Sequence, residues 1–301
     1  MSNMKTLVLG SNGLIGSNIK LEGEVVYCTK QEVDLLQPYD LIDLLKSSKC
    51  ERVINCAGDQ KSLTSMGKKH FSHFVNNMMM NINTLNACVK SEVVKEIVII
   101  SSINALNDSE NLDESKIFNG PPSDGLYSDG YVKRMLHLMN RALREEYDIK
   151  CFTPLVTNVY GSKGNTVLGN WLNNGIIPLL IDKFISAKLK HEDVTVEGDG
   201  SPIRDFIFVK DLNKLIGKCL DLNIDNVIIT PGNPVTILDL VSLIVEEINF
   251  KGKVCWTNKK FGNNNKYYNN NLLTSLFPNF EFTSLSKGIK ETIEWYTKVR
   301  E

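Results

Sequence analysis

The stretch YSDGYVKRM (127–135) carries two tyrosines and a lysine that could act as acid–base groups. Side chains four residues apart lie on one face of a helix, so Lys133 shares its face with Asp129. Tyr131 points away from that face, whereas Tyr127 precedes or begins the helix, where a loop could turn it inward. Asp129 is either a carboxylate base or a helix N-terminal acid paired with Lys133. Tyr127, Asp129 and Lys133 are therefore catalytic candidates.

A glycine-rich stretch, GSNGLIG (10–16), directly follows the first apolar run. Such a loop needs a positive φ in its tight turn, a close backbone approach to a pyrophosphate, and helix–strand packing without a Cβ. Its place between a strand and a helix favours dinucleotide binding over a simple glycine turn. The predicted cofactor contacts in this loop are Gly10, Asn12, Gly13, Leu14, Ile15 and Gly16.

The end of the second apolar run, YCTKQEVDLL, bears on the type of cofactor. It offers Lys30 and no acid at its tip, which favours NADP(H) over NAD(H), although Lys30 could be a solvated surface lysine. Asp34 and Leu35 either line the adenine or cap the next helix. Cys56 and Ala57, at the end of the third run, are also expected at the cofactor.

The first half of the chain alternates short apolar runs with amphipathic segments. The runs read as buried strands at 5–10, 24–29, 51–57 and 96–102. Helices are expected near 13–20, 38–48, 70–91 and 129–147, followed by a strand with its exit loop at 150–161. Val- and Ile-rich strands between helices predict a parallel sheet covered on both faces.

After residue 161 the pattern changes. A helix is expected around 175–190, and Thr236 with Asp239 three residues later forms a capping-box pattern that opens another. The sequence therefore predicts an α/β fold, a Rossmann-type doubly wound parallel sheet (1–161) with a smaller C-terminal α/β substrate lobe (162–301). The asparagine-rich tract at 261–271 reads as an exposed loop rather than a site.

Composition excludes several classes of function. The net charge is −1 and the basic residues are scattered, which argues against nucleic-acid and membrane partners. The seven cysteines are widely spaced without a CxxC pair, and no histidines stand at metal-ligand distances, so a reduced cytoplasm and no metal are expected. The sequence shows neither a leader nor a membrane-spanning apolar stretch.

Several blocks along residues 5–215 together resemble the GDP-L-fucose synthase family of extended short-chain dehydrogenases/reductases: GSNGLIG, SSI, GYVK, VTNVYG, IIPLLIDKF and VEGDGSPIRDFIFVKDL. The resemblance implies a homodimer formed by paired helices, NADPH, and a GDP-linked nucleotide sugar. The implied reaction epimerises GDP-4-keto-6-deoxymannose at C3 and C5 and then reduces C4. Thr157 and Asn158 would lie beside the nicotinamide.

The resemblance also implies substrate contacts. Arg204 would bind the substrate diphosphate, with a surface salt bridge to Asp205 or Asp211 as the alternative. Lys163 and Asn165 could touch the substrate or simply form a turn.

The catalytic positions depart from the family pattern. Members have Ser-Ser-Cys or Ser-Thr-Cys after the fourth strand, Tyr-x-x-x-Lys on the next helix, and a histidine before the IPALI helix. Here Ser101 and Lys133 are retained, whereas Ile103, Asp129 and Gly175 replace the cysteine, tyrosine and histidine. None of the chain's histidines falls at a family catalytic position, and those at 70 and 73 are expected to lie on a helix face.

These replacements affect both steps of the implied reaction. Hydride addition at C4 leaves an alkoxide that the family tyrosine protonates, and an aspartate beside a lysine is ionised near neutrality. Loss of one acid–base group typically lowers turnover about 10²–10⁴-fold. Ile103 and Gly175 cannot act as the acid or base of an epimerase. Two hypotheses follow: a nucleotide-sugar enzyme with altered chemistry, or a catalytically silent regulatory or partner subunit that still binds these ligands.

Overall fold

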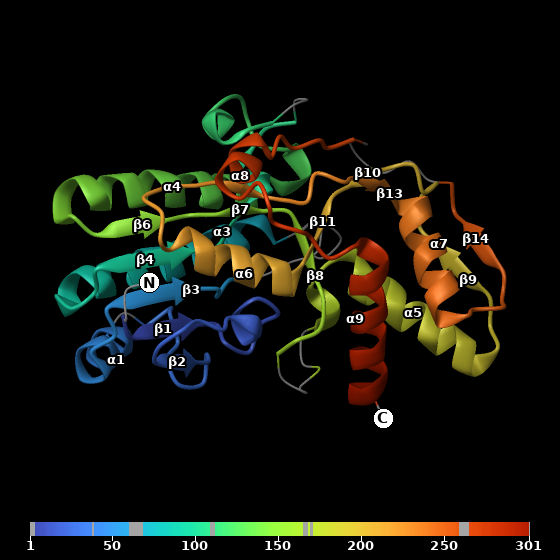
Figure 1. The fold of residues 1–301 in the computed structure, drawn as a ribbon, viewed down its shortest axis with the longest axis horizontal. Coiled ribbons are helices and arrows are strands. Elements are labelled where there is room, and N and C mark those ends of the chain that lie inside the picture. Colours follow the sequence, from blue (N-terminus) through green and yellow to red (C-terminus); the bar gives the residue numbers. More distant parts are fainter. Residues whose placement is uncertain are drawn as a thin grey trace.

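The computed structural model describes residues 4–37, 39–59, 69–108, 112–164, 168, 171–258 and 265–300. A five-stranded, all-parallel sheet with strand order β2-β1-β3-β4-β6 forms the first lobe (Figure 1). Its strands are β1 (Thr6–Leu9), β2 (Val25–Cys28), β3 (Arg52–Asn55), β4 (Glu96–Ile99) and β6 (Lys150–Phe152). The order reverses beside β1, which is the point where open α/β sheets bind ligands.

Helices cover both faces of this sheet. One face carries α1 (Asp40–Ser48), α3 (His70–Ser91) and α4 (Tyr127–Tyr147), and the other carries α6 (Val209–Cys219) and α8 (Asn271–Leu276). Successive strand residues point to opposite faces, so Leu7 and Leu9 pack in the first core and Val8 in the second. The predicted doubly wound α/β fold is confirmed.

The strands β4 and β6 are interrupted and then resume. A second small sheet joins β5 (Ser101–Ser102), β7 (Leu155–Val156) and β12 (Ile228–Ile229). The segment 150–161, expected to be a strand with its exit loop, therefore holds three strands, β6, β7 and β8 (Asn158–Tyr160). Pro154 explains the first break because it has no N–H for the ladder, while its carbonyl accepts a hydrogen bond from the Ser101 amide at 2.9 Å.

The second lobe has its own core. It contains α5 (Ile176–Lys190), α7 (Ile237–Ile248) and α9 (Leu285–Arg300), seen beside one another in Figure 1. Three strand pairs accompany them: β8 with β11 (Phe206–Phe208), β9 (Val194–Val196) with β14 (Val254–Trp256), and β10 (Ile203–Arg204) with β13 (Val235–Thr236). The predicted cap at Thr236 is confirmed, since its Oγ accepts a 3.0 Å hydrogen bond from the Asp239 amide. The division at residue 161 stays a prediction, and α6 and α8 return to the first lobe.

Short 3₁₀ turns complete the chain: η1 (Gly16–Asn18), η2 (Ile103–Ala105), η3 (Glu114–Lys116), η4 (Asp124–Leu126) and η5 (Trp171–Asn173). The helix expected at 13–20 is wrong, because only η1 follows the glycine loop. At a rise of about 1.5 Å per residue, a helix needs about nine residues to run back along a four-residue strand. After the loop, residues 17–24 must also make the turn at Gly23 before β2 begins.

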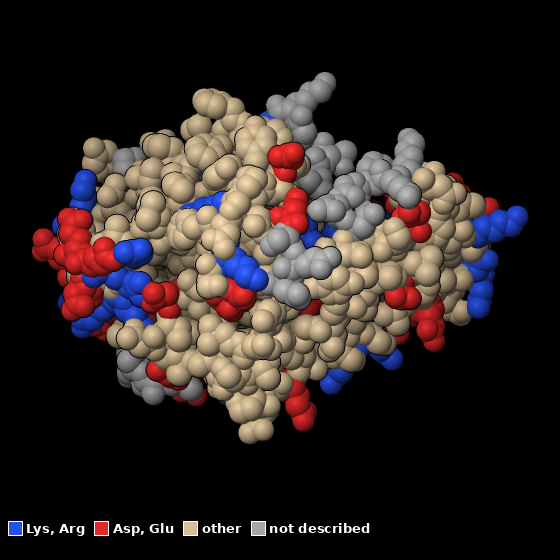
Figure 2. All heavy atoms as spheres, turned by 90° about the horizontal axis from the view of Figure 1, so that it is seen from above, with Lys and Arg blue, Asp and Glu red and all other residues tan. Residues whose placement is uncertain are grey.

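The charged surface is mixed. Figure 2 shows acidic and basic side chains interspersed rather than separated into broad patches of one sign. Among the described helices, none is both long and apolar enough to cross a bilayer.

Candidate functional site

Several loops meet where the parallel strands end. The glycine loop leaves β1, Cys56 and Ala57 follow β3, and Ser101 follows β4. The Cys56 amide donates to Leu9 O at 3.0 Å, and the Ile100 amide donates to Asn55 O at 3.1 Å, so these ends are tied together. Burial raises the pKa of Cys56 to about 12, which keeps it a neutral thiol.

Two glycines of the loop are required by packing. Gly10 has φ +72°, and a Cβ built there would lie 2.7 Å from the Ala57 amide nitrogen. A Cβ on Gly16 would lie 2.4 Å from Gly10 O. At Gly13, by contrast, the only described atom within 4 Å of an added Cβ is Gly10 O at 3.2 Å. Gly13 is exposed and is thus the position where a ligand can approach the backbone.

The glycine loop leaves room for a dinucleotide, but a single 3₁₀ turn follows it instead of a full helix. Asn12 and Gly13 are exposed, whereas Leu14 is buried in the core of the second lobe and Ile15 is half-buried. The single turn after the loop provides a much smaller dipole than a full helix. Thr157 Oγ1 is buried and has no hydrogen-bond partner among the described residues, so a polar group of a ligand could satisfy it.

The tip of β2 holds charges of both signs. Lys30 is exposed and its Nζ lies 3.6 Å from Asp34 Oδ2. Asp34 Oδ1 accepts from the Leu36 amide, and Leu35 is buried with its carbonyl bound by Asn83. Glu32, which sequence reasoning missed, accepts from the amide and hydroxyl of Thr29, and these hydrogen bonds lower its pKa. Thus Lys30 remains available to a phosphate, with two acids near it.

Asp129, Lys133 and His137 follow one another at four-residue intervals on α4, on the side of the helix that faces the ends of β4 and β5. Lys133 Nζ donates to Ile100 O at 3.2 Å. One turn later, His137 Nε2 lies 3.1 Å from Ser101 Oγ, and both groups are buried. His137 was not predicted, although its spacing from Asp129 and Lys133 is visible in the sequence.

Asp129 is held by an amide. Asn104 Nδ2 donates to Asp129 Oδ2 at 2.9 Å, and His73 Nε2 lies 3.8 Å from Asp129 Oδ1. The pairing of Asp129 with Lys133, one of the two alternatives for Asp129, is not found among the described ion pairs, and Lys133 donates to the Ile100 carbonyl instead. The expectation that His73 lies on a helix surface is wrong, since this side chain is buried.

Tyr127 begins α4 and stacks on His70. Their ring centroids are 4.4 Å apart with an interplanar angle of 17°. His70 Nδ1 is also 2.9 Å from Ser128 Oγ. Tyr127 is exposed, so the structure places it at the rim rather than beside Lys133.

Arg204 lies on β10, where Tyr268 and Asp108 act on it electrostatically. Its Nη1 donates to Ile203 O at 2.8 Å, and burial is the main cause that lowers its pKa. The nearby Asn158 Nδ2 donates to Asp205 O at 2.9 Å. Asp205 accepts from Thr230 and Gly232, and Asp211 accepts from Thr283, so both alternative carboxylates are occupied within the fold.

The asparagine-rich tract contributes to this region. Tyr268 pairs with Leu112 through an isolated bridge, and its hydroxyl is buried without a described hydrogen-bond partner. Its pKa is raised, chiefly by burial, and Arg204 and Asp108 act on it electrostatically. The interpretation of the tract as an exposed loop is therefore wrong for Tyr268, whereas Asn265, Tyr267 and Asn271 are exposed. Asn165 lies outside the described residues.

Residues 6–226 match the NAD dependent epimerase/dehydratase family. The chain belongs to that family. It is 32% identical to the GDP-L-fucose synthase of Dictyostelium discoideum over 309 residues, covering 98% of this chain and 96% of the relative. It is 26% identical to a probable GDP-L-fucose synthase of Drosophila melanogaster, covering 97% of each.

The fold agrees with solved structures. A GDP-L-fucose synthetase from Naegleria fowleri bound to NADP matches with a TM-score of 0.87 at 22% identity, covering 99% of this chain and 95% of that chain. The predicted relation to GDP-L-fucose synthases and the Rossmann-type fold are confirmed.

In this member of the epimerase/dehydratase family, positions 103 and 175 carry no side chain that could act as an acid or a base. Ile103 is buried in an apolar cluster with neighbours such as Leu106 and Leu155. Gly175 precedes α5 with φ +100°, and no described atom lies within 4 Å of a Cβ built there. A larger side chain at position 175 would have room, but the positive φ would strain the backbone of a residue other than glycine.

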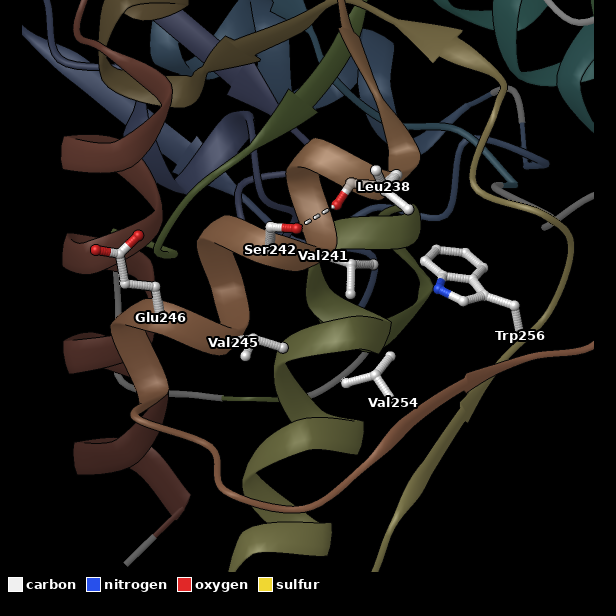
Figure 3. A pocket seen from close by; sticks show the side chains of 7 residues that line it. All are labelled: Leu238, Val241, Ser242, Val245, Glu246, Val254 and Trp256. Atoms are coloured by element: carbon white, nitrogen blue, oxygen red, sulfur yellow. Dashed lines mark hydrogen bonds between the residues drawn. The ribbon is translucent and has the colours of Figure 1, made fainter.

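A separate hollow of about 260 Å³ lies between α7 and β14 in the second lobe (Figure 3). Val241, Val245 and Trp256 line it, and the Ser242 hydroxyl is already bonded to Leu238 O at 2.9 Å. This lining lacks the convergent polar groups that a nucleotide needs, so the strand ends remain the candidate site. Within the described residues, no group of His, Cys, Asp or Glu could hold a metal ion.

Proposed function

We propose that this protein binds NADP(H) and a nucleotide-diphosphate sugar, GDP-linked in preference, and carries altered chemistry. It would not be an efficient 3,5-epimerase, and any carbonyl reduction would proceed without a tyrosine. The observation that carries the proposal is the arrangement on α4: Lys133 donates to the Ile100 carbonyl at the strand ends, and Asp129, which the resemblance aligns with the family tyrosine, is held by Asn104. The resemblance noted in the sequence implies that Ile103 and Gly175 would be the other replaced groups.

Cofactor choice is supported by relatives and by charge. Solved relatives include the Naegleria fowleri enzyme bound to NADP and a Campylobacter jejuni GDP-mannoheptose C4 reductase with NADP bound. Gly10, Gly13 and Gly16 would hold the pyrophosphate, and Lys30 would meet a 2′-phosphate. Thr157 and Asn158 would lie beside the nicotinamide, and Arg204 would bind the sugar-nucleotide diphosphate.

The chain's own residues would act as follows. NADPH supplies the hydride when it is bound. Lys133, fixed by the Ile100 carbonyl, provides positive charge at the strand ends. Asp129 accepts a hydrogen bond from Asn104, which suits a base and not the proton donor that carbonyl reduction requires.

A catalytically silent binding subunit is the second candidate. It is favoured by Ile103, because an apolar residue packed in a core cluster leaves no acid–base group at that position. Both candidates predict binding of NADPH and of the sugar nucleotide. Turnover separates them.

A homodimer is supported by an apolar stripe on neighbouring helices. Phe71, Val75 and Met79 are exposed on α3, and Tyr131 and Leu138 are exposed on α4. Covering these side chains would remove apolar surface from water. Met79→Lys should therefore give a monomer in sedimentation, whereas Leu189→Lys, at an exposed leucine on α5, should leave the dimer intact. Cysteines without disulfides support a cytoplasmic location.

The deciding experiment measures NADPH binding and then NADPH oxidation with GDP-4-keto-6-deoxymannose. We expect binding, no epimerised product, and oxidation about 10²–10⁴-fold below that of an active relative. Asp129→Tyr should increase oxidation, and Asp124→Tyr is the surface control. Failure to bind NADPH contradicts both candidates, and efficient epimerisation contradicts the altered chemistry.

A further inference from the structure

Ser101 and His137 form a buried pair behind Lys133. Ser101 Oγ and His137 Nε2 are 3.1 Å apart, and these residues are 1% and 7% exposed. His137 lies one helical turn beyond Lys133 on the same face of α4. Nothing in the proposed function yet uses this imidazole.

A cavity of about 140 Å³ reaches His137 from outside. Its lining includes Glu114, Phe118, Asn140 and Arg141. Asn140 donates to Thr153 Oγ1, while its Oδ1 is buried without a partner among the described residues. Phe118 and Arg141 are exposed at the mouth, so solvent can enter. The volume and the unsatisfied amide oxygen suit several ordered waters.

The imidazole is neutral near pH 7. Burial, and then the charge of Lys133, lower its pKa to about 4. The cavity is also lined by two basic and two acidic side chains, so their charges balance: Arg141, Arg144, Glu114 and Asp225. A neutral imidazole has one N–H and one acceptor nitrogen, so it can take a proton on one side and give one on the other.

We propose that His137 is a positioning and relay residue that supplies protons from the cavity to Ser101, which acts as the proton donor in place of the missing tyrosine. This inference rests on the proposed function. As the carbonyl carbon gains the hydride of NADPH, its oxygen takes the Ser101 hydroxyl proton. Ser101 is reprotonated from His137 Nε2, and a cavity water protonates His137 Nδ1 and leaves as hydroxide. NADPH is oxidised, and the ketone is reduced to an alcohol.

The other candidate donors are placed less well. Tyr127 stacks on His70 at the rim, and Asp129 accepts the Asn104 amide. Ser101 lies at the strand ends, and its hydroxyl contacts the imidazole of His137, which lines the cavity that solvent can enter.

The test compares wild type, His137→Gln and His137→Ala, with His191→Asn as a surface-histidine control. NADPH affinity should stay within about twofold in all four proteins, whereas single-turnover NADPH oxidation with GDP-4-keto-6-deoxymannose should fall about 10²-fold in both His137 variants. Free imidazole should restore the rate of His137→Ala and leave that of His137→Gln low, which a purely structural role would not produce.

A second readout does not depend on turnover. In ¹⁵N spectra of the imidazole, His137 should titrate near pH 4, and Ser101→Ala should change its ring signals. Unchanged ring signals, oxidation unaffected by His137→Gln, or a wild type that binds both ligands without oxidising NADPH would each overturn the relay alone. A wild type that does not bind NADPH refutes the proposed function and the relay with it.

Discussion

Gly13 offers a direct test of the cofactor site because it is separable from the fold. A methyl group there would lie 3.2 Å from Gly10 O, a contact that small adjustments relieve. Where the backbone suits alanine, Gly→Ala stabilises by about 0.4–1 kcal/mol, which offsets this contact. We therefore expect the melting temperature of Gly13→Ala to stay within about 2 °C of wild type. NADPH affinity should fall at least about tenfold, or about 1.4 kcal/mol, because the methyl occupies the face that the pyrophosphate approaches.

Gly16→Ala is the matched variant. Its methyl would lie 2.4 Å from the same carbonyl oxygen, which is backbone and cannot move cheaply. Overpacking of this kind costs about 1–3 kcal/mol, which would lower the melting temperature by several degrees. Fluorescence titration with NADPH and thermal melts of both variants measure the two effects. Full NADPH affinity in a stable Gly13→Ala protein would refute pyrophosphate binding at this loop.

Three further predictions concern stability. Glu96→Gln should lower the free energy of unfolding by about 3–5 kcal/mol in urea titrations, because Arg52 is buried against this carboxylate; Glu51→Gln, in an exposed pair, should lower it by less than about 1 kcal/mol. Thr236→Ala should cost about 1 kcal/mol through loss of the α7 cap, and Thr236→Ser should not. The pKa of His137 is about 4 in the folded protein against an ordinary value of 6.5. Between these two pH values the unfolded protein therefore binds one proton more than the folded protein. Stability should fall as the pH drops from about 6.5 to 4, by roughly 3 kcal/mol at 1.36 kcal/mol per unit, and His137→Phe should remove this part of the slope.

Much of the fold could be predicted because periodicity reports burial directly. The apolar runs that became β1, β3 and β4 are buried on both faces, and α3 was predicted over its full range. The prediction of a helix after the glycine loop was wrong because the glycine motif alone does not set the length of the next element, whereas the few residues before β2 leave room for a single turn. The break at Pro154 was missed although proline carries the signal.

The candidate site could be predicted only at positions where a single residue type meets the physical requirement. Gly10 and Gly16 follow from the close approach of backbones. Asn104 and His73 could not be found, since their contacts with Asp129 come from distant segments brought together by the fold. His137 is intermediate, because its spacing from Lys133 was visible but its partner on β5 was not.

Under the proposed function, Asp129, Lys133 and His137 on α4 would let this fold keep its ligands while its chemistry differs. In the family pattern that this sequence resembles, the tyrosine and the lysine would stand one turn apart on this helix. Here the first turn ends in a carboxylate that accepts from Asn104, whereas the next turn beyond Lys133 presents an imidazole to Ser101. One turn corresponds to about 5.4 Å along the helix, so in the proposed relay protons would come from the cavity lined by His137 rather than from the side of Tyr127. Hydride transfer and proton delivery would then respond to different substitutions, because the proposal assigns the cofactor to Gly13 and Lys30 and the proton to His137.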